Sequence, residues 1–260
     1  MAINREKALA AARVPFEVPS PEERADRLPA VLSVIYLIFT EGSTATAGAA
    51  LIRVDLAREA IRLARMLARL MPEPETFGLL ALLELTASRF PARLDGNGEP
   101  VLLEDQDRHR WDRSGMRRGQ AALAAAGRAG RGLGSYGVQA AIAECHAIAP
   151  SVEATDWSRI VVLYDALGRL APSPIVSLNR AVAVSMADGP AAALPIVDDL
   201  VASGSLAGSH LLPTVRGELL VRMGRDPEAR EELTAAVHLC RNDGERRVLE
   251  RKLAALGDGG

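Results

Sequence analysis

The C-terminal half of the chain contains an internal repeat. Residues 174–200 read PIVSLNRAVAVSMADGPAAALPIVDDL, and residues 210–236 read HLLPTVRGELLVRMGRDPEAREELTAA. Small and apolar side chains recur at an offset of 36 residues, namely Ala181, Val184, Ala193, Val197 and Leu200, then Gly217, Leu220, Ala229, Leu233 and Ala236. Small residues let two helices approach closely, and larger ones fill the groove toward the next repeat. The pattern therefore predicts stacked pairs of antiparallel helices.

Turn residues separate the two helices of each predicted pair. They stand at residues 188–190 (DGP) and 224–227 (GRDP), where proline suits the first turn of the second helix. A weaker third copy ends in residues 164–172, YDALGRLAP, and residues 245–256 predict a charged helix that caps the stack. This is the tetratricopeptide pattern, so we expect hairpins of that kind in this half of the chain.

Helical signals also recur through the N-terminal half. Ser20 and Glu23 have the spacing of a capping box at a helix start. Residues 51–70 show a period of 3.6 residues that predicts a buried stripe, formed by Leu56, Ala60, Leu63, Leu67 and Leu70. Further helices are predicted over residues 76–90, 116–126 and 138–148.

These patterns predict an all-α protein, since hairpin turns between alternating β-branched runs do not occur. We expect three segments along the chain. Residues 1–19 form a tail or linker, residues 20–150 form a helical bundle, and residues 151–260 form tetratricopeptide-like hairpins with a C-terminal capping helix. Together the helices are expected to continue as a right-handed α-solenoid.

Composition narrows the function classes. The chain has 260 residues with 31 Lys plus Arg against 33 Asp plus Glu, so overall charge does not favour nucleic-acid binding. Cys145 and Cys240 cannot form a disulfide framework, lack metal-ligand spacing in the sequence and suit a reducing cytoplasm. The longest apolar run, residues 30–39, is too short to span a bilayer, and no signal peptide is evident. We therefore expect a cytoplasmic protein without membrane contact.

The densest group of chemically active side chains lies in residues 102–113, LLEDQDRHRWDR. The glycine that an EF-hand loop needs is missing, and no nucleophile accompanies the carboxylates, so metal binding and catalysis are both disfavoured. One interpretation is an ion-paired loop whose side chains cap neighbouring helices. The other is a partner-binding segment, for which we name Glu104, Asp105, Gln106, Asp107, Arg108, Trp111 and Asp112. We expect no catalytic residue, metal or cofactor.

Several longer stretches, taken together, resemble a known family. They are residues 14–19 (VPFEVP), 27–42 (RLPAVLSVIYLIFTEG), 102–112 (LLEDQDRHRWD), 139–147 (QAAIAECHA), 155–190 (TDWSRIVVLYDALGRLAPSPIVSLNRAVAVSMADGP) and 242–256 (NDGERRVLERKLAAL). The order and the amino-acid sequences of these stretches resemble the C-terminal extension of extracytoplasmic-function (ECF) RNA polymerase sigma factors. In that family an ordinary sigma core precedes a tetratricopeptide-like helical domain.

The resemblance implies a regulatory domain that binds protein partners, either regions 2 and 4 of a sigma core or RNA polymerase itself. It departs from the family because residues 3–13 are too few for a helix-turn-helix, although they could be the tail of region 4. Thr40 and Ser43 also differ from the family's commoner Asn and Tyr. We therefore expect no promoter recognition by this chain alone. The alternatives are a stand-alone scaffold that binds a peptide or small molecule and, less favoured, an enzyme that uses the Glu104–Asp112 carboxylates.

Overall fold

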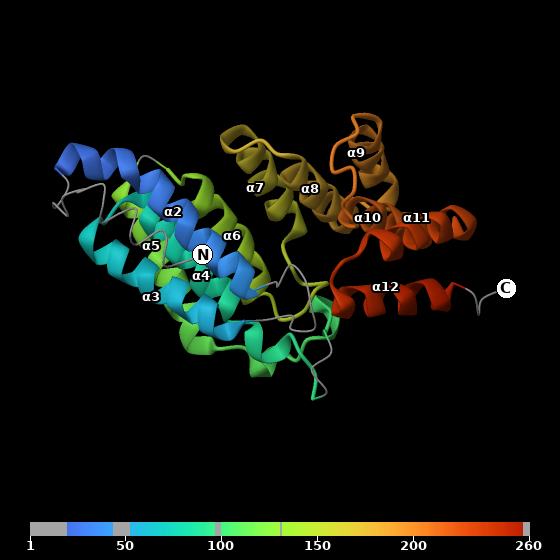
Figure 1. Ribbon diagram of the computed structural model, residues 1–260, viewed down its shortest axis with the longest axis horizontal. Coiled ribbons are helices and arrows are strands. Elements are labelled where there is room, and N and C mark those ends of the chain that lie inside the picture. The colour runs from blue at the N-terminus through green and yellow to red at the C-terminus, as the bar shows by residue number, and fades with distance from the viewer. Residues whose placement is uncertain (1–19, 44–52, 97–99, 131, 257–260) are drawn as a thin grey trace, which may run out of the picture. The chain divides into compact units, whose positions relative to one another are not determined.

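The computed structural model describes residues 20–43, 53–96, 100–130 and 132–256, so the predicted tail at residues 1–19 lies outside the described residues. The chain divides into two compact units, residues 1–34 and residues 35–260. The described helices are α2 (Pro21–Ser43), α3 (Val54–Leu70), α4 (Pro74–Ala87), α5 (Arg113–Ala129), α6 (Ser135–Ile148), α7 (Trp157–Leu170), α8 (Pro174–Ala187), α9 (Pro190–Ala202), α10 (Leu211–Arg222), α11 (Asp226–Leu239) and α12 (Asp243–Ala255) (Figure 1). Short 3-10 helices are η1 (Phe90–Ala92), η2 (Leu103–Asp105) and η3 (Arg108–Arg110). The all-α prediction is confirmed.

Helix α2 begins at the predicted capping box. The Ser20 backbone N–H donates to Glu23 Oε2 at 2.8 Å, and the Glu23 N–H donates to Ser20 Oγ at 3.2 Å. The helix ends at Ser43, so Thr40 and Ser43 both lie in its last turn. Phe39 is buried there and stacks on Phe90, with ring centres 6.0 Å apart.

Of the stripe predicted on α3, only Ala60 is buried. The buried residues are Ala57, Ala60, Ile61, Ala64 and Ala68. Leu56, Leu63 and Leu67 are half-buried, and Leu70 is 69% exposed. For the leucines the prediction is wrong by about one residue around the helix, because the small alanine side chains allow α3 to approach α4 closely.

Helix α4 is the centre of the N-terminal helices, packing against α3, α5 and α6. Its leucines 79, 83 and 85 are almost fully buried. Glycine permits the closest of these crossings. A Cβ atom on Gly78 would lie 2.6 Å from the backbone nitrogen of Gly137, and one on Gly119 would lie 2.6 Å from Leu85 Cγ. The helix backbones therefore meet where the side chain is missing.

The repeat has the predicted register. Helices α8 and α9 form the first hairpin, α10 and α11 form the second, and all ten aligned positions are buried. The turns contain Gly189 at φ +94° and Gly224 at φ +70°, a backbone region that favours glycine. Helix α12 follows as the expected C-terminal helix and buries Leu249. The predicted division at residue 150 stays a prediction.

None of the helices in the described ranges combines the length and apolar character needed to cross a membrane.

Candidate functional site

The structure places several residues of the predicted interaction segment at helix ends. Asp107 Oδ1 accepts the N–H of His109 at 2.9 Å, and Asp112 Oδ1 accepts the N–H of Ser114 at 2.9 Å, at the start of α5. The Arg108 guanidinium donates to two carbonyl oxygens within and beyond the last turn of α6, His146 at 3.0 Å and Ala149 at 2.7 Å. These groups satisfy backbone atoms that a helix end leaves unpaired. Asp107, Arg108 and Asp112 thus have the capping role that the first interpretation of this segment predicted.

Trp111 lies in the core rather than on the surface. Only 3% of the residue is exposed, and the guanidinium carbons of Arg108 and Arg89 lie 4.6 and 5.8 Å from its ring centre. Trp111 is therefore not a surface anchor for a partner, and that part of the expectation is wrong. Gln106 is buried too, and its side-chain amide donates to the Val101 carbonyl at 3.1 Å. Glu104 and Asp105 are exposed, and their role in partner binding stays a prediction.

His146 lies behind this segment as a neutral, partly buried histidine. Burial, together with the neighbouring charges of Arg89 and Arg108, lowers its pKa to about 4. Its ring packs edge-on against Trp157 with centres 5.2 Å apart. The neighbouring Cys145 is a buried free thiol. Cys145 thus lies in the core and His146 at its boundary.

A groove of about 330 Å³ opens between the start of the segment and the first helices of the repeats. Leu103 and Glu104 form one wall, and α8, α10 and α12 form the other. Val182 and Met186 project into it and are 38% and 37% exposed. Its other lining residues are Leu102, Val152, Trp157, Ser185, Thr214, Val215, Glu218, Leu219, Arg222 and Lys252. The groove therefore has an apolar floor that solvent reaches.

Charges surround this apolar floor. Lys252 forms an ion pair with Glu218 at the α10–α12 side, and Arg222 donates to the Ser185 carbonyl at 3.2 Å. Glu104 stands opposite them and is exposed. A ligand would thus meet apolar contacts in the middle and charged groups of both signs at the rim.

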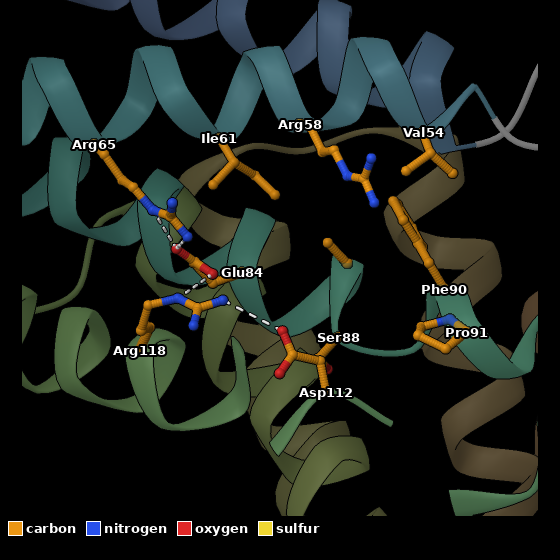
Figure 2. Close-up of a pocket in the computed structure, with 11 residues that line it drawn as sticks. Val54, Arg58, Ile61, Arg65, Glu84, Ser88, Phe90, Pro91, Asp112 and Arg118 are labelled. Carbon is orange, nitrogen blue, oxygen red and sulfur yellow. Dashed lines mark hydrogen bonds and ion pairs between the residues drawn. The ribbon is translucent and has the colours of Figure 1, made fainter. Parts of the chain in front are cut away.

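A second cavity, of about 460 Å³, lies among the N-terminal helices and contains a buried carboxylate (Figure 2). Glu84 is 3% exposed, and its two oxygens accept from Arg65 Nε at 2.7 Å and Arg118 Nε at 3.0 Å. Arg118 also contacts Asp112 Oδ2 at 3.3 Å, which extends the network to the predicted segment. Figure 2 shows the Arg58 guanidinium directed into the same cavity.

Sequence reasoning missed Glu84 and the groove. The available signal for Glu84 was a single acidic residue within the apolar run GLLALLEL, residues 78–85 of α4. Such a residue is buried only when cationic groups neutralise it. For the groove there was no local signal, because its walls come from residues about 80 to 150 positions apart.

Three comparisons with known proteins bear on this architecture. Residues 27–127 match the model of a family of unknown function (DUF6596). An uncharacterized protein of Rhizobium meliloti (strain 1021) is 49% identical over 256 residues, which are 98% of this chain and 60% of that protein. The chain thus spans about 60% of the length of this relative.

The likeness to a solved structure concerns the fold. The crystal structure of a thermophilic TPR protein of Thermus thermophilus covers 88% of this chain and 97% of its own, with 16% identity and a TM-score of 0.53. At this identity the likeness extends to the arrangement of helices and no further. The chain is therefore similar to tetratricopeptide proteins in architecture, an all-helical scaffold.

Proposed function

We propose that the chain is a protein-interaction scaffold that modulates transcription initiation by docking part of a sigma core or RNA polymerase. The groove between Leu103 and helices α8, α10 and α12 is the observation that carries the proposal. Docking would be intramolecular if the sigma core belongs to the same polypeptide. A signal would then shift the balance between a docked and a released state.

The shape and chemistry of the groove suit an amphipathic helical segment. Such a segment inserts apolar side chains spaced three or four residues apart into an apolar floor. Met186 and Val182 provide that floor, and methionine adapts to ligands of different shape. Glu104 on one rim favours a basic residue on the partner, whereas Arg222 on the other favours an acidic one.

The sigma factor is the preferred partner because of the ordered stretches that resemble the extension of ECF sigma factors, from residue 14 to residue 256. The Rhizobium relative has 40% of its length outside the matched region, which leaves room in that protein for further domains. Within this proposal the chain acts in the cytoplasm, is not an enzyme and does not recognise a promoter alone.

Binding measurements with a groove variant test the proposal. Val182→Glu places a charge on the floor and is expected to weaken binding of purified sigma core regions 2 and 4 at least about tenfold, since an unpaired charge would be desolvated. Val201→Glu is the matched control, because Val201 is 49% exposed on α9 and outside the groove. Equal binding by wild type and both variants would contradict docking in this groove.

Transcription assays test the regulatory part of the proposal. The full-length sigma factor is compared with a version that lacks this chain, and with Asp105→Ala, which changes an exposed residue next to Glu104. We expect promoter-dependent transcription to change in both cases, with the melting temperature of Asp105→Ala unchanged. If melting temperature and transcription fall together in that variant, Asp105 is structural and is withdrawn as a contact.

A stand-alone scaffold is the second candidate, because the tetratricopeptide-like fold suits peptide binding with or without a sigma core. The coding sequence separates the two. Sigma regions encoded upstream in the same reading frame support the first candidate. If they are missing and the groove still captures a peptide or small molecule, the second candidate holds.

A further inference from the structure

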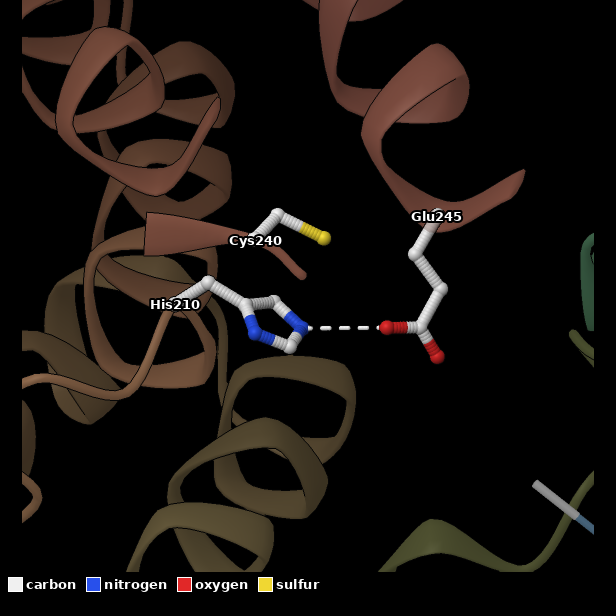
Figure 3. A group of neighbouring side chains, drawn as sticks. All are labelled: His210, Cys240 and Glu245. Atoms are coloured by element: carbon white, nitrogen blue, oxygen red, sulfur yellow. Dashed lines mark ion pairs between the residues drawn. The ribbon is translucent and has the colours of Figure 1, made fainter. Parts of the chain in front are cut away.

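The end of α11 and the starts of α10 and α12 bring together three side chains of different metal-ligand types. His210 precedes α10, Cys240 follows α11, and Glu245 lies in the first turn of α12 (Figure 3). His210 Nε2 lies 3.3 Å from Glu245 Oε2, and the nitrogen, sulfur and oxygen atoms all lie within 4.8 Å of one another. In the described part of the chain, no other such group of His, Cys, Asp and Glu occurs.

We propose that His210, Cys240 and Glu245 bind a divalent metal ion of the zinc type. Zinc accepts this mixture of nitrogen, sulfur and oxygen ligands at about 2.0–2.3 Å, and a tetrahedral site then separates its ligand atoms by roughly 3.3–3.7 Å. The histidine and glutamate atoms already have that separation. The ligand atoms lie within 4.8 Å of one another, so the sulfur needs to move closer by at most roughly 1.1–1.5 Å.

Charge balance also favours a divalent ion. A thiolate and a carboxylate carry two negative charges, a neutral imidazole adds none, and the thiol proton is released on binding. Cys240 is 4% exposed, whereas the side chains of His210 and Glu245 are 23% and 33% exposed. The site thus has one buried ligand and two that an ion can reach from solvent.

Local hydrogen bonds hold the three backbones in place. Asn242 is buried, and its Oδ1 accepts the N–H groups of Gly244 at 2.9 Å and Glu245 at 3.1 Å. The Cys240 N–H donates to Ala236 O at 3.0 Å, and Thr214 Oγ1 donates to His210 O at 2.7 Å. Ligands that are positioned before the ion arrives lose less entropy on binding.

A hollow of about 330 Å³ gives access to the site. His210 and Glu245 line it together with Arg93, whose guanidinium donates to the Ser43 carbonyl at 2.8 Å. Three protein ligands leave a fourth position open toward this hollow. The positive charge of Arg93 favours an anionic group there, such as hydroxide.

The consequence of metal binding would be a fixed position for α12. Glu245 lies in the first turn of this helix, and Lys252, two turns later, lines the groove of the proposed function. The ion would therefore hold one wall of the groove in place. Metal binding itself does not depend on what the groove binds, so the two proposals fail separately.

Titration of the full chain with Co²⁺ alone tests the site. The protein carries no metal-binding tag and is treated with a chelator beforehand. We expect a thiolate-to-cobalt charge-transfer absorption that saturates at one ion per chain and disappears when Zn²⁺ is added. Cys240→Ser is expected to lose the absorption. Cys145→Ser, which alters the other buried free thiol, is expected to keep it.

Two partly exposed ligands provide variants that do not rely on a buried position. His210→Ala and Glu245→Gln are expected to weaken Zn²⁺ binding by more than the roughly 10- to 100-fold that loss of an outer-shell partner costs. His238→Ala, at an exposed histidine of α11, should bind as the wild type does. If wild type shows no absorption, or Cys240→Ser retains it, the three residues are an ion pair beside a buried thiol and the proposal is overturned.

Discussion

Glu84 is a charged side chain among leucines on the innermost helix of the N-terminal half. Its carboxylate is buried, while Arg65 and Arg118 are 41% and 46% exposed in their side chains. The arginines therefore remain partly hydrated. Their positive charge compensates the Glu84 carboxylate for the hydration that it has lost. This arrangement avoids most of the cost of burying a complete ion pair.

Glu84→Gln is expected to destabilise the protein by about 1–3 kcal/mol, because two guanidinium groups would then face a neutral amide. Partial exposure of both arginines keeps the loss below that of a fully buried pair. Urea unfolding of wild type and variant measures this loss of unfolding free energy. Glu59→Gln is the control, since Glu59 pairs with Arg62 on the surface at 2.6 Å and solvent screens that pair, so its loss should change the unfolding free energy far less than the loss of Glu84. Equal effects in the two variants would contradict the conclusion that Glu84 is a buried carboxylate neutralised by Arg65 and Arg118.

His146 makes stability depend on pH. Its pKa is lowered from 6.5 to about 4 in the folded protein, chiefly by burial, so the unfolded chain binds the proton more tightly. The contribution of the neutral ring is fully present above pH 6.5 and is lost as the pH falls toward 4. The loss amounts to about 3 kcal/mol at most.

His146→Gln is expected to reduce the slope of unfolding free energy against pH in this window. Urea unfolding at intervals between about pH 7 and pH 4 provides the comparison, and exposed His238→Gln should retain the wild-type slope. A His146→Gln slope identical to that of wild type would show that the histidine is not held neutral.

At the scale of elements, glycine and alanine set how closely helices pack. A Cβ atom on Gly217 would lie 2.9 Å from Leu233 Cγ, across the α10–α11 hairpin. Gly168 on α7 differs, since nothing lies within 4 Å of the same atom there. The same residue type therefore serves packing at one position and merely weakens the helix at the other.

Gly217→Leu and Ala229→Leu are expected to cost about 1–3 kcal/mol each, because both positions are buried and the added side chain has no space. Gly168→Ala should instead stabilise the protein by about 0.5–1 kcal/mol, since alanine favours a helix. Denaturation midpoints measure all three. Unchanged midpoints for both leucine variants would refute the repeat register.

At the scale of the whole molecule, residues 103–112 connect distant parts of unit 35–260. Arg108 reaches the end of α6, Asp112 begins α5, and Trp111 enters the core between two arginines. Leu103 and Glu104 of the same stretch form one wall of the groove. The same segment therefore contributes both to the stability of the fold and to the proposed binding surface.

Trp111→Ala is expected to lower stability by about 3–5 kcal/mol and the melting temperature by roughly 10 °C, because a large core side chain is removed. Arg110→Ala changes an exposed neighbour and should stay within about 0.5 kcal/mol. A melting temperature of Trp111→Ala close to that of wild type would contradict the buried position of Trp111. Trp111 would then again be a candidate surface contact for a partner.

Local patterns were sufficient for the helices, the turns and the register of the repeat. Helical period, proline and glycine positions, and the alternation of small and large residues at a constant offset act over a few turns of chain. They correctly predicted the buried Ala181 and Gly217 and the capping box of Ser20. Such features depend on neighbours close in the sequence, and these are visible without knowledge of the packing.

Contacts between distant helices were beyond the reach of those patterns. They determined which face of α3 is buried, that Trp111 lies inside, and that Arg65 and Arg118 neutralise Glu84. They also brought together His210, Cys240 and Glu245, whose separations along the sequence match no metal-binding motif. The physical reason is that burial and pairing depend on which side chains meet across helices, and a one-dimensional period contains no information about the opposing surface.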